Sequence, residues 1–439
     1  MNTFLIQGVV PSIRSSDYEC LLGDPFRYFL TRRLGIRPAL SSSQALARGS
    51  WFHVAAEYDD FHGLYSPSHP GVSRFYTLLD KRVEELTETC ARLGIVGDAR
   101  RTIVATERED AETALAWYSA ASRVVITPTI KTFRDYFSRP FWKVLGREVP
   151  ASFPHLYDFN PAHATARRTT FDLLVQDLNT NLLWVVDWKT CSEPTTVRLA
   201  SCPIEYQTLH SLYLLEDLLK TGIVSHHFPS VNEDTKVGGM IHVAIQKPSL
   251  RFGQQDRDFT LDTSPLKSGP RKGQPRNEKN FHGEPKLANF LARCEDWYQG
   301  IGDYTHLQPE RNASPTVNIS HTYFHKLDEE ARSDYLARTE FIGSHAIRDP
   351  VPSNFLKSAS NIAPYGTLSP YAPFYLCPPS QWPEIMHRDN FTIEHRDLSP
   401  QSVLHPTPLI FPSPSTQDQA QIQGESPQEG TPLVSGPGA

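Results

Sequence analysis

The stretch that decides the fold reads Phe171-Asp172-Leu173-Leu174-Val175-Gln176 and, after a polar break, Leu182-Leu183-Trp184-Val185-Val186-Asp187-Trp188-Lys189-Thr190. Both segments are apolar and rich in β-branched or aromatic residues, which is typical of paired strands. Residues 178–181 between them include two asparagines, a residue type that tolerates left-handed turn geometry. The pattern therefore predicts a β-hairpin.

The charged residues of this hairpin are expected to gather on one face. If the turn is symmetric, Asp172 lies opposite Asp187. Because side chains alternate along a strand, Asp187 and Lys189 share a face while Trp188 points to the other. Two carboxylates whose Cβ atoms are about 4.5 to 5.5 Å apart repel each other unless something neutralises their charge. A divalent cation is the natural candidate.

This residue set suits the hydrolysis of a phosphodiester. Asp172 and Asp187 are hard oxygen ligands for magnesium or manganese, and the backbone carbonyl of Trp188 would complete the shell. Lys189 would orient or deprotonate the attacking water and offset charge in the transition state. An isolated Asp-x-Lys is more often a solvated edge charge. Here the apolar flanks favour a buried strand, in which an unpaired charge is costly.

Further strands and a helix are predicted on both sides of the hairpin. Residues 144–149 read as an entering strand that carries Glu148, followed by a long connection. That connection would contain His155, His163, Arg167 and Arg168. A helix opening at Pro203 carries Gln207, and residues 237–246 read as a buried strand. This order predicts an α/β fold with a mixed central β-sheet flanked by helices.

An amphipathic helix is expected earlier in the chain. Ser41-Ser42-Ser43 provides a plausible N-cap for it. In this helix Gly49, His53 and Glu57 follow one another at four-residue steps and line one stripe. Because the stripe is half polar, we expect it to face a cleft. Residues 74–122 continue the helical pattern.

These separate blocks together resemble the PD-(D/E)xK nuclease superfamily and, within it, the RecB-like and phage-exonuclease-like branch. The blocks that carry the resemblance are residues 18–30, Gly49-x-x-x-His53, Glu148, Asp172, Asp187-Trp188-Lys189-Thr190 and Gln207. The resemblance covers residues 15–62 and 145–220. It implies a restriction-endonuclease-like core with helical elaborations.

The resemblance also implies roles for individual residues. The metal ligands would be His53, Asp172, Asp187 and Trp188, and the catalytic residues Asp172, Asp187, Lys189 and Gln207. Supporting residues would be Glu148, Gly49 and Tyr206. The cofactor would be Mg²⁺ or Mn²⁺.

The chain departs from the family pattern at three points. Thr169 and Thr170 stand where the family has proline or glycine before the first aspartate. Ser211 replaces a tyrosine of the helix after the hairpin, with Tyr206 and Tyr213 as possible substitutes. For the iron-sulfur cluster of some relatives, the chain offers only Cys20, Cys294 and Cys377, so no such cluster is expected.

Composition sets the wider limits. The chain has 439 residues and a formal net charge of -6, so any nucleic-acid contact must be local rather than spread over a basic surface. Six scattered cysteines indicate reduced thiols. We see neither a leader nor an apolar run long enough for a bilayer, and expect a cytoplasmic protein without membrane contact, in the host cytoplasm if a phage encodes it.

The expected organisation is one large domain and a tail. Residues 1–398 would form the nuclease-like domain, with an N-terminal helical part at 15–144, a core at about 145–250 and a C-terminal elaboration at 251–398. Residues 399–439, rich in Pro, Ser and Gln, would be disordered. A basic loop at 267–276 is either a solvated surface loop or a phosphate contact, and the sequence leaves both open.

The leading functional hypothesis is a metal-dependent DNA nuclease, a RecB-like exonuclease or endonuclease acting in DNA recombination, repair or phage DNA processing. The alternative is a catalytically inactive DNA-binding or scaffold protein that keeps the nuclease fold. A third hypothesis is a metal-dependent hydrolase of another phosphoester. The expected partner is DNA, and a homo-oligomer or a recombination or helicase partner is compatible with the chain.

Overall fold

The structure is a computed structural model that describes residues 12–40, 44–59, 69–127, 129–156, 164–300, 315–347, 353, 355–363 and 368–393. Four features that carry predictions above lie outside the described residues. They are the serine cap at 41–43, the side chain of His155, His163 and the tail at 399–439.

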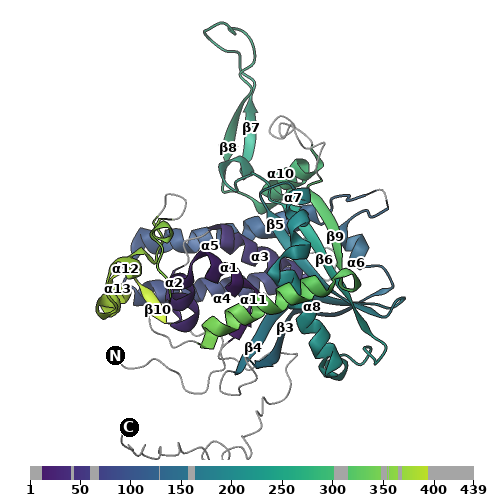
Figure 1. Cartoon of the computed structure of the whole chain (residues 1–439). Coiled ribbons are helices and arrows are strands. Elements are labelled where there is room, and N and C mark those ends of the chain that lie inside the picture. The colour runs from purple at the N-terminus through teal and green to yellow at the C-terminus, as the bar shows by residue number, and fades with distance from the viewer. Residues whose placement is uncertain are drawn as a thin grey trace, which may run out of the picture.

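A six-stranded mixed sheet forms the centre of the molecule (Figure 1). Its strands are β1 (Ser12–Arg14), β3 (Trp142–Leu156), β4 (Ala164–Asp177), β5 (Leu182–Cys191), β6 (Lys236–Gln246) and β9 (Val317–Tyr323). The order is β1-β4-β5-β6-β9, with β3 paired to β4. The pairs β1–β4 and β5–β6 are parallel and the others antiparallel. The predicted mixed α/β sheet is confirmed.

The predicted hairpin is β4 and β5. Their ladder runs from the turn up to the pair Leu173↔Val186. In the turn Asn181 adopts the left-handed region with φ of 54°, and Asp177 Oδ1 accepts a hydrogen bond from the Asn179 N–H at 2.9 Å. Side-chain capping by aspartate and a left-handed asparagine are local signals, which is why the sequence alone reveals this turn.

The predicted long connection before the hairpin is wrong. β3 pairs with β4 as far as Leu156↔Ala164, so Arg167 and Arg168 lie on a strand. Arg167 is tolerated there because its guanidinium donates to Asp217 Oδ2 at 2.6 Å and to the Tyr335 hydroxyl at 3.0 Å. Partners from distant helices thus allow a charged residue to be buried, and no local pattern reports them.

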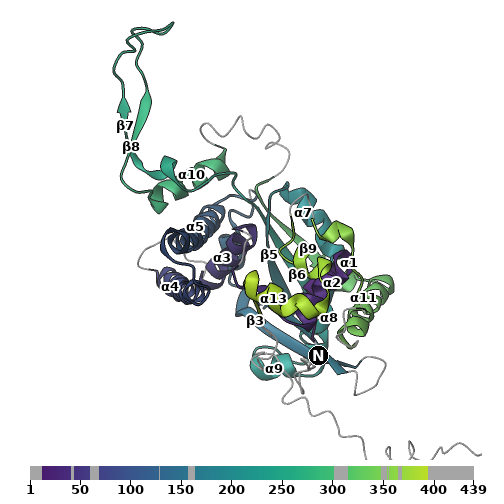
Figure 2. The ribbon, with the colours of Figure 1, turned by 90° about the vertical axis from the view of Figure 1, so that its left-hand side faces the viewer.

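Helices cover both faces of the sheet (Figure 2). One face carries α3 (Gln44–Tyr58), α4 (Pro70–Arg92), α5 (Gly97–Ala121), α6 (Phe133–Phe137) and α10 (Leu287–Gln299). The other carries α8 (Tyr206–Lys220) and α9 (Ile223–His227). Side chains alternate between two cores, since Leu173 and Val175 of β4 pack under the first group of helices and Leu174 under the second. The alternation fixes which residues of each strand reach α8.

The helix predicted to open at Pro203 begins later, at Tyr206. Pro203 belongs to a short 3₁₀ turn, Cys202–Ile204, that follows α7 (Thr195–Ser201). Glu205 then takes extended geometry at the N-cap, with φ of -65° and ψ of 137°. Gln207 therefore still lies in the first turn of α8, at the end that faces β5.

Both ends of the described chain pack together. From the N-terminal part come α1 (Ser15–Gly23), α2 (Pro25–Tyr28), a π-helical turn (Phe29–Arg33) and β2 (Ile36–Pro38). From the C-terminal part come α11 (Glu329–Ile347), α12 (Ala372–Leu376), α13 (Trp382–Arg388) and β10 (Phe391–Ile393). These elements share one aromatic core, and β10 pairs with β2.

The basic segment predicted as a loop belongs to a β-hairpin. The strands β7 (Asp258–Asp262) and β8 (Glu278–His282) pair antiparallel with each other and with no other described strand. They extend away from the body of the molecule (Figure 1). We call residues 257–283 the arm. Among the described helices, none has the length and apolar composition of a membrane span.

Candidate active site

Three carboxylates form a row across β3, β4 and β5. In the register of β3 and β4, Glu148 falls across from Asp172. The ladder between β4 and β5 ends at the pair Leu173↔Val186. One residue further from the turn, Asp172 on β4 lies beside Asp187 on β5. The charge crowding expected from a symmetric turn therefore extends to a third strand.

Glu148 has an unusual backbone for its position. Its φ is 44°, in the left-handed region that non-glycine residues seldom adopt. A register shift between Val144 and Gly146 lies just before it in β3. A residue in this conformation costs of the order of 1–3 kcal/mol and persists where its surroundings enforce it, often at functional sites. Here it aims the Glu148 carboxyl toward α3.

A histidine from α3 completes a group that we call the ligand cluster: His53, Glu148 and Asp172. His53 Nδ1 lies 3.3 Å from Asp172 Oδ2 and 3.9 Å from Glu148 Oε1. One potential ligand atom from each residue lies within 4.8 Å of the others. An imidazole and two carboxylates are a donor set that suits a divalent cation. The residues present thus fit a metal ion.

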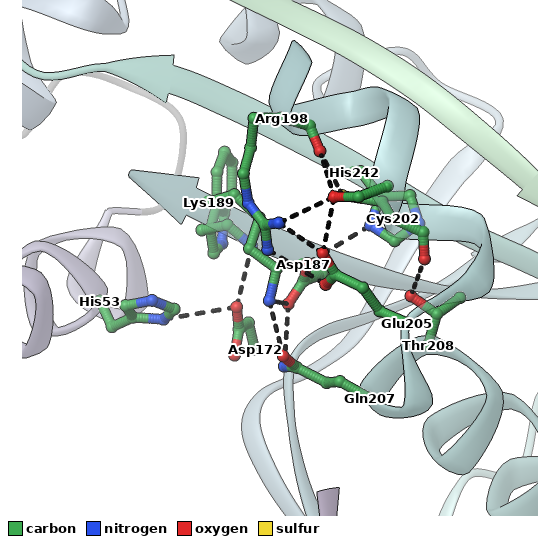
Figure 3. A network of polar contacts seen from close by, with 12 residues as sticks. His53, Asp172, Asp187, Lys189, Arg198, Cys202, Glu205, Gln207, Thr208 and His242 are labelled. Atoms are coloured by element: carbon green, nitrogen blue, oxygen red, sulfur yellow. Dashed lines mark hydrogen bonds and ion pairs between the residues drawn. The ribbon is translucent and has the colours of Figure 1, made fainter. Parts of the chain in front are cut away.

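A second group, which we call the lysine group, lies beside it: Asp187, Lys189, Gln207 and His242 (Figure 3). Asp187 is 4% exposed. Its Oδ1 accepts from Lys189 Nζ at 3.0 Å and Gln207 Nε2 at 3.2 Å, and its Oδ2 lies 3.3 Å from His242 Nδ1. Lys189 Nζ also donates to Gln207 Oε1 at 2.7 Å. Asp187 thus belongs to a hydrogen-bond network, while the ligand cluster contains Asp172.

Trp188 joins the two groups through its backbone. Its N–H donates to Asp172 Oδ2 at 2.9 Å. Its indole lies in the core on the other face, with ring centroids 5.2 Å from Phe133 and 6.0 Å from Phe137. The predicted alternation of Trp188 against its two neighbours is confirmed. The role of its carbonyl as a metal ligand stays a prediction.

Neighbouring charges perturb the ligand cluster. Burial disfavours a charged His53, but Asp172 and then Glu148 outweigh it and raise the pKa of His53 to about 9. Burial, reinforced by Asp172, raises the pKa of Glu148 to about 7. An imidazolium therefore balances the carboxylates when no metal is bound. A bound cation would balance them instead, with His53 deprotonated so that it can act as a ligand.

The lysine group holds one ion pair. Burial opposes the ionisation of Asp187, yet Lys189 and His242 lower the pKa of Asp187 below its usual value. Burial likewise opposes a charge on Lys189, and Asp187 outweighs it and raises the pKa of Lys189. Lys189 is thus a cation at neutral pH. Of the two predicted roles, this favours stabilising negative charge over removing a proton from water.

A cleft opens beside the ligand cluster. Its volume is 590 Å³, and it is lined by Leu46, Gly49, Ser50, His53, Val54, Glu57, Glu148, Thr190 and Lys247. The predicted stripe Gly49, His53 and Glu57 therefore faces a cleft. A Cβ added at Gly49 would meet no atom within 4 Å, so glycine widens this cleft rather than relieving a close contact.

The structure places Tyr206 and Tyr213 in the core shared by both chain ends. Tyr206 is 1% exposed, and its hydroxyl pairs with Thr339 Oγ1 at 2.9 Å. Tyr213 stacks on Tyr335 with centroids 4.7 Å apart. Neither phenol contacts Lys189 or Gln207 among the described contacts. Ser211, where the family has a tyrosine, is buried in α8.

Sequence reasoning missed His242. It is completely buried on β6, between Asp187 and Thr322, whose Oγ1 lies 3.1 Å from its Nε2. The signal was present, because a histidine stands inside an otherwise apolar strand and such a group needs partners. Arg198 and Glu205, an ion pair with atoms 3.0 Å apart that flanks the lysine group, were missed as well (Figure 3).

A mixed sheet with a row of carboxylates, an adjacent lysine and a histidine from a covering helix defines the nuclease class of α/β protein. A model of the PD-(D/E)XK nuclease superfamily matches residues 15–303. The chain belongs to this superfamily, as its sequence blocks predicted. The match spans both the ligand cluster and the lysine group. A search of curated proteins finds no match, and the RecB-like branch stays a prediction.

Proposed function

We propose that the protein is a magnesium- or manganese-dependent deoxyribonuclease that hydrolyses phosphodiester bonds. One observation carries the proposal: the ligand cluster, assembled from α3, β3 and β4, lies beside a charged lysine in the same site. The resemblance adds a RecB-like exonuclease or endonuclease in DNA recombination, repair or phage DNA processing. A homo-oligomer or a recombination or helicase partner belongs to the same proposal.

The proposed roles follow from the contacts. His53, Glu148 and Asp172 would hold the ion, with Asp187 and the Trp188 carbonyl as further ligands. When bound, the ion lowers the pKa of a water and neutralises phosphate oxygens. Lys189 would act on the substrate directly.

Lys189 would donate to a non-bridging phosphate oxygen, where negative charge grows in the transition state. Asp187 keeps it charged and Gln207 fixes its direction, since the two accept its hydrogen bonds at 3.0 and 2.7 Å. A lysine held by two partners loses little further freedom on reaction. This arrangement supports a pre-organised catalytic group.

The inactive scaffold remains the alternative, and the lysine group argues against it. Burying an ion pair such as Asp187 and Lys189 carries a desolvation penalty of several kcal/mol per ion, which its own attraction offsets only in part. A binding protein without catalysis gains nothing from that penalty. The cleft also opens onto His53 and Glu148 of the ligand cluster.

The test uses the full chain with labelled single- and double-stranded DNA in Mg²⁺, Mn²⁺ or EDTA. We expect cleavage with metal, none in EDTA, and loss of cleavage in Lys189→Met. The matched control is Lys220→Met, at the far end of α8. If the wild type leaves every DNA intact in both metals, the nuclease proposal is wrong. A competing small phosphodiester separates a DNase from a hydrolase of other phosphoesters.

A further inference from the structure

The arm is longer than its two assigned strands. Beyond Asp262 and Glu278 the same register continues, with a bridge between Pro265 and Pro275 and a hydrogen bond from the Leu266 N–H to the Gln274 carbonyl at 2.9 Å. Paired residues therefore run over 258–266 and 274–282. At about 3.4 Å per residue, the arm spans roughly 30 Å.

The root of the arm is anchored to the core. Asp256, which is completely buried, accepts from Arg293 Nη1 at 2.6 Å and from the Gly253 N–H at 2.8 Å. Arg293 belongs to α10, which packs on α5 and whose Phe290 and Trp297 are buried in the core. A buried ion pair at the root holds the arm in a defined direction.

The tip of the arm is strongly basic. Residues 263–277 contain no acidic side chain and four cationic ones, in a chain of net charge -6. The strands β7 and β8 form the stem of the arm. Arg276 Nε lies 3.9 Å from Asp262 Oδ2 of this stem, and Arg276 Nη1 lies 3.6 Å from Glu278 Oε2. The other three are exposed, and none of them forms an ion pair within the part of the chain that the structure describes: Lys267, Arg271 and Lys272.

The arm rises from the edge of the sheet at which the cleft opens. β5 and β6 are parallel, so their carboxyl ends lie at one edge. Thr190 near the end of β5 and Lys247 just after β6 both line the cleft, and the Lys247 N–H donates to the Cys191 carbonyl at 2.8 Å. The chain enters the root of the arm at Gly253, six residues beyond Lys247.

We propose that the arm is a nucleic-acid clamp whose basic tip binds the phosphate backbone of DNA extending from the cleft. The inference rests on the proposed function for the substrate in that cleft. The ligand of the tip is a polyanion because the tip offers exposed cations without acidic partners. The apolar face of the stem is small, since only Phe259 and Leu261 are half exposed there and Lys279 Nζ covers the Phe259 ring at 4.7 Å. A protein partner would need a larger apolar surface.

The first experiment measures binding without cleavage. A labelled DNA duplex of about 30 base pairs, roughly three times the length of the arm, is titrated in EDTA at several salt concentrations. The tip variant carries Lys267→Gln, Arg271→Gln and Lys272→Gln. The control variant carries Lys220→Gln, Lys236→Gln and Lys326→Gln, exposed lysines near the opposite edge of the sheet.

We expect the tip variant to bind about tenfold or more weakly, and its log-log salt slope to be less steep by about 2 to 3, because each lost phosphate contact removes about 0.9 from the slope. The control variant should bind within about twofold of the wild type. Equal affinity of tip variant and wild type would overturn the proposal, and so would a wild type that binds no duplex.

A second experiment separates the arm from catalysis. The tip variant should hydrolyse bis(4-nitrophenyl) phosphate in Mn²⁺ as fast as the wild type, while its KM for the duplex rises. If the wild type hydrolyses neither substrate, the proposed function fails, yet the binding result still decides the clamp. If the tip variant changes the chain from dimer to monomer with unaltered DNA affinity, the arm joins two copies and the clamp proposal is wrong.

Discussion

The lysine group and the ligand cluster lie side by side but are held in different ways. Asp187 is 4% exposed and its two carboxylate oxygens have partners on β5, β6 and α8. In the ligand cluster, His53 and Glu148 have side chains 34% and 31% exposed. The side chain of Asp172, the third member of the ligand cluster, is 13% exposed.

The difference indicates that the lysine group, unlike the ligand cluster, is fully formed before a metal ion binds. Packing of α8 on β5 and β6 fixes Asp187 and Lys189, since their partners lie on these three elements. The ligand cluster depends on the approach of α3 and on the left-handed backbone at Glu148. We therefore expect variants of Lys189 to change mainly the rate, and variants of the ligand cluster to change mainly metal affinity.

The largest effect is expected from Lys189→Met, which removes the charge and keeps the length of the side chain. Hydrolysis should fall by about 10³-fold, the upper range for losing one electrostatic contact to the transition state. Metal affinity should change by less than about threefold. Single-turnover cleavage and a Mn²⁺ titration measure the two quantities, with Lys220→Met as the control. A metal affinity that falls as far as the rate would show that the lysine group and the ligand cluster do not act separately.

Asp172→Asn should act mainly on metal binding. The amide oxygen can still accept the Trp188 N–H, which the carboxylate accepts at 2.9 Å, so the backbone contact is kept while the charge is lost. Metal affinity should fall by about 10- to 100-fold, and the rate should recover in part at high metal concentration. Calorimetry of Mn²⁺ binding measures this, with Asp177→Asn in the turn of the same hairpin as the matched control. A rate that no metal concentration restores would contradict the assignment.

His242→Gln should have a smaller effect, mainly on the rate. His242 contacts Asp187 Oδ2 at 3.3 Å and lies far inside the sheet, so the substitution loosens Asp187 without removing a charge from the ligand cluster. We expect about a tenfold lower rate and a smaller loss of metal affinity, because Asp187 is only a further ligand and the ligand cluster keeps its own side chains. His321→Gln on β9 is the control, because His321 contacts Tyr136 rather than the lysine group. Equal losses in both variants would assign His242 to fold stability alone.

The sequence predicts the lysine group better than the ligand cluster, for a physical reason. Asp187 and Lys189 stand on one strand, where alternation and apolar flanks are local signals. The contact between His53 and Glu148 joins elements 95 residues apart. Only the resemblance to a family could place them together, and the geometry of the contact depends on a left-handed residue that no periodicity reports.

Several other strands were missed because pairing rather than local preference forms them. β1 has only three residues and β9 alternates polar with apolar side chains beside the buried β6. The arm has few apolar residues, so its composition resembles a loop. The basic tip was visible in the sequence, but the hairpin that presents it was not.

The smallest effect is expected from Glu148→Gln, in the stability of the metal-free chain. The pKa of Glu148 is raised from 4.5 to about 7 by burial and by Asp172. A group whose pKa is higher in the folded than in the unfolded state stabilises the fold below its unfolded pKa, and that contribution is lost as the pH rises through the folded pKa. The wild type in EDTA should therefore lose about 1 kcal/mol more free energy of unfolding between about pH 5 and 8 than the variant does, a value reduced for partial solvent exposure.

Metal should reverse this difference. Saturating Mg²⁺ would bind the ionised carboxylates of Glu148 and Asp172 and displace the proton of Glu148, so the wild type should gain more stability than Glu148→Gln. Glu57→Gln serves as the control, because Glu57 lines the same cleft outside the ligand cluster. Urea unfolding of the wild type and both variants at several pH values, with EDTA or Mg²⁺, gives the free energies of unfolding to be compared. If Glu148→Gln and the wild type respond alike to pH and to metal, Glu148 is not a ligand. Only His53 and Asp172 of the ligand cluster then remain as ligands.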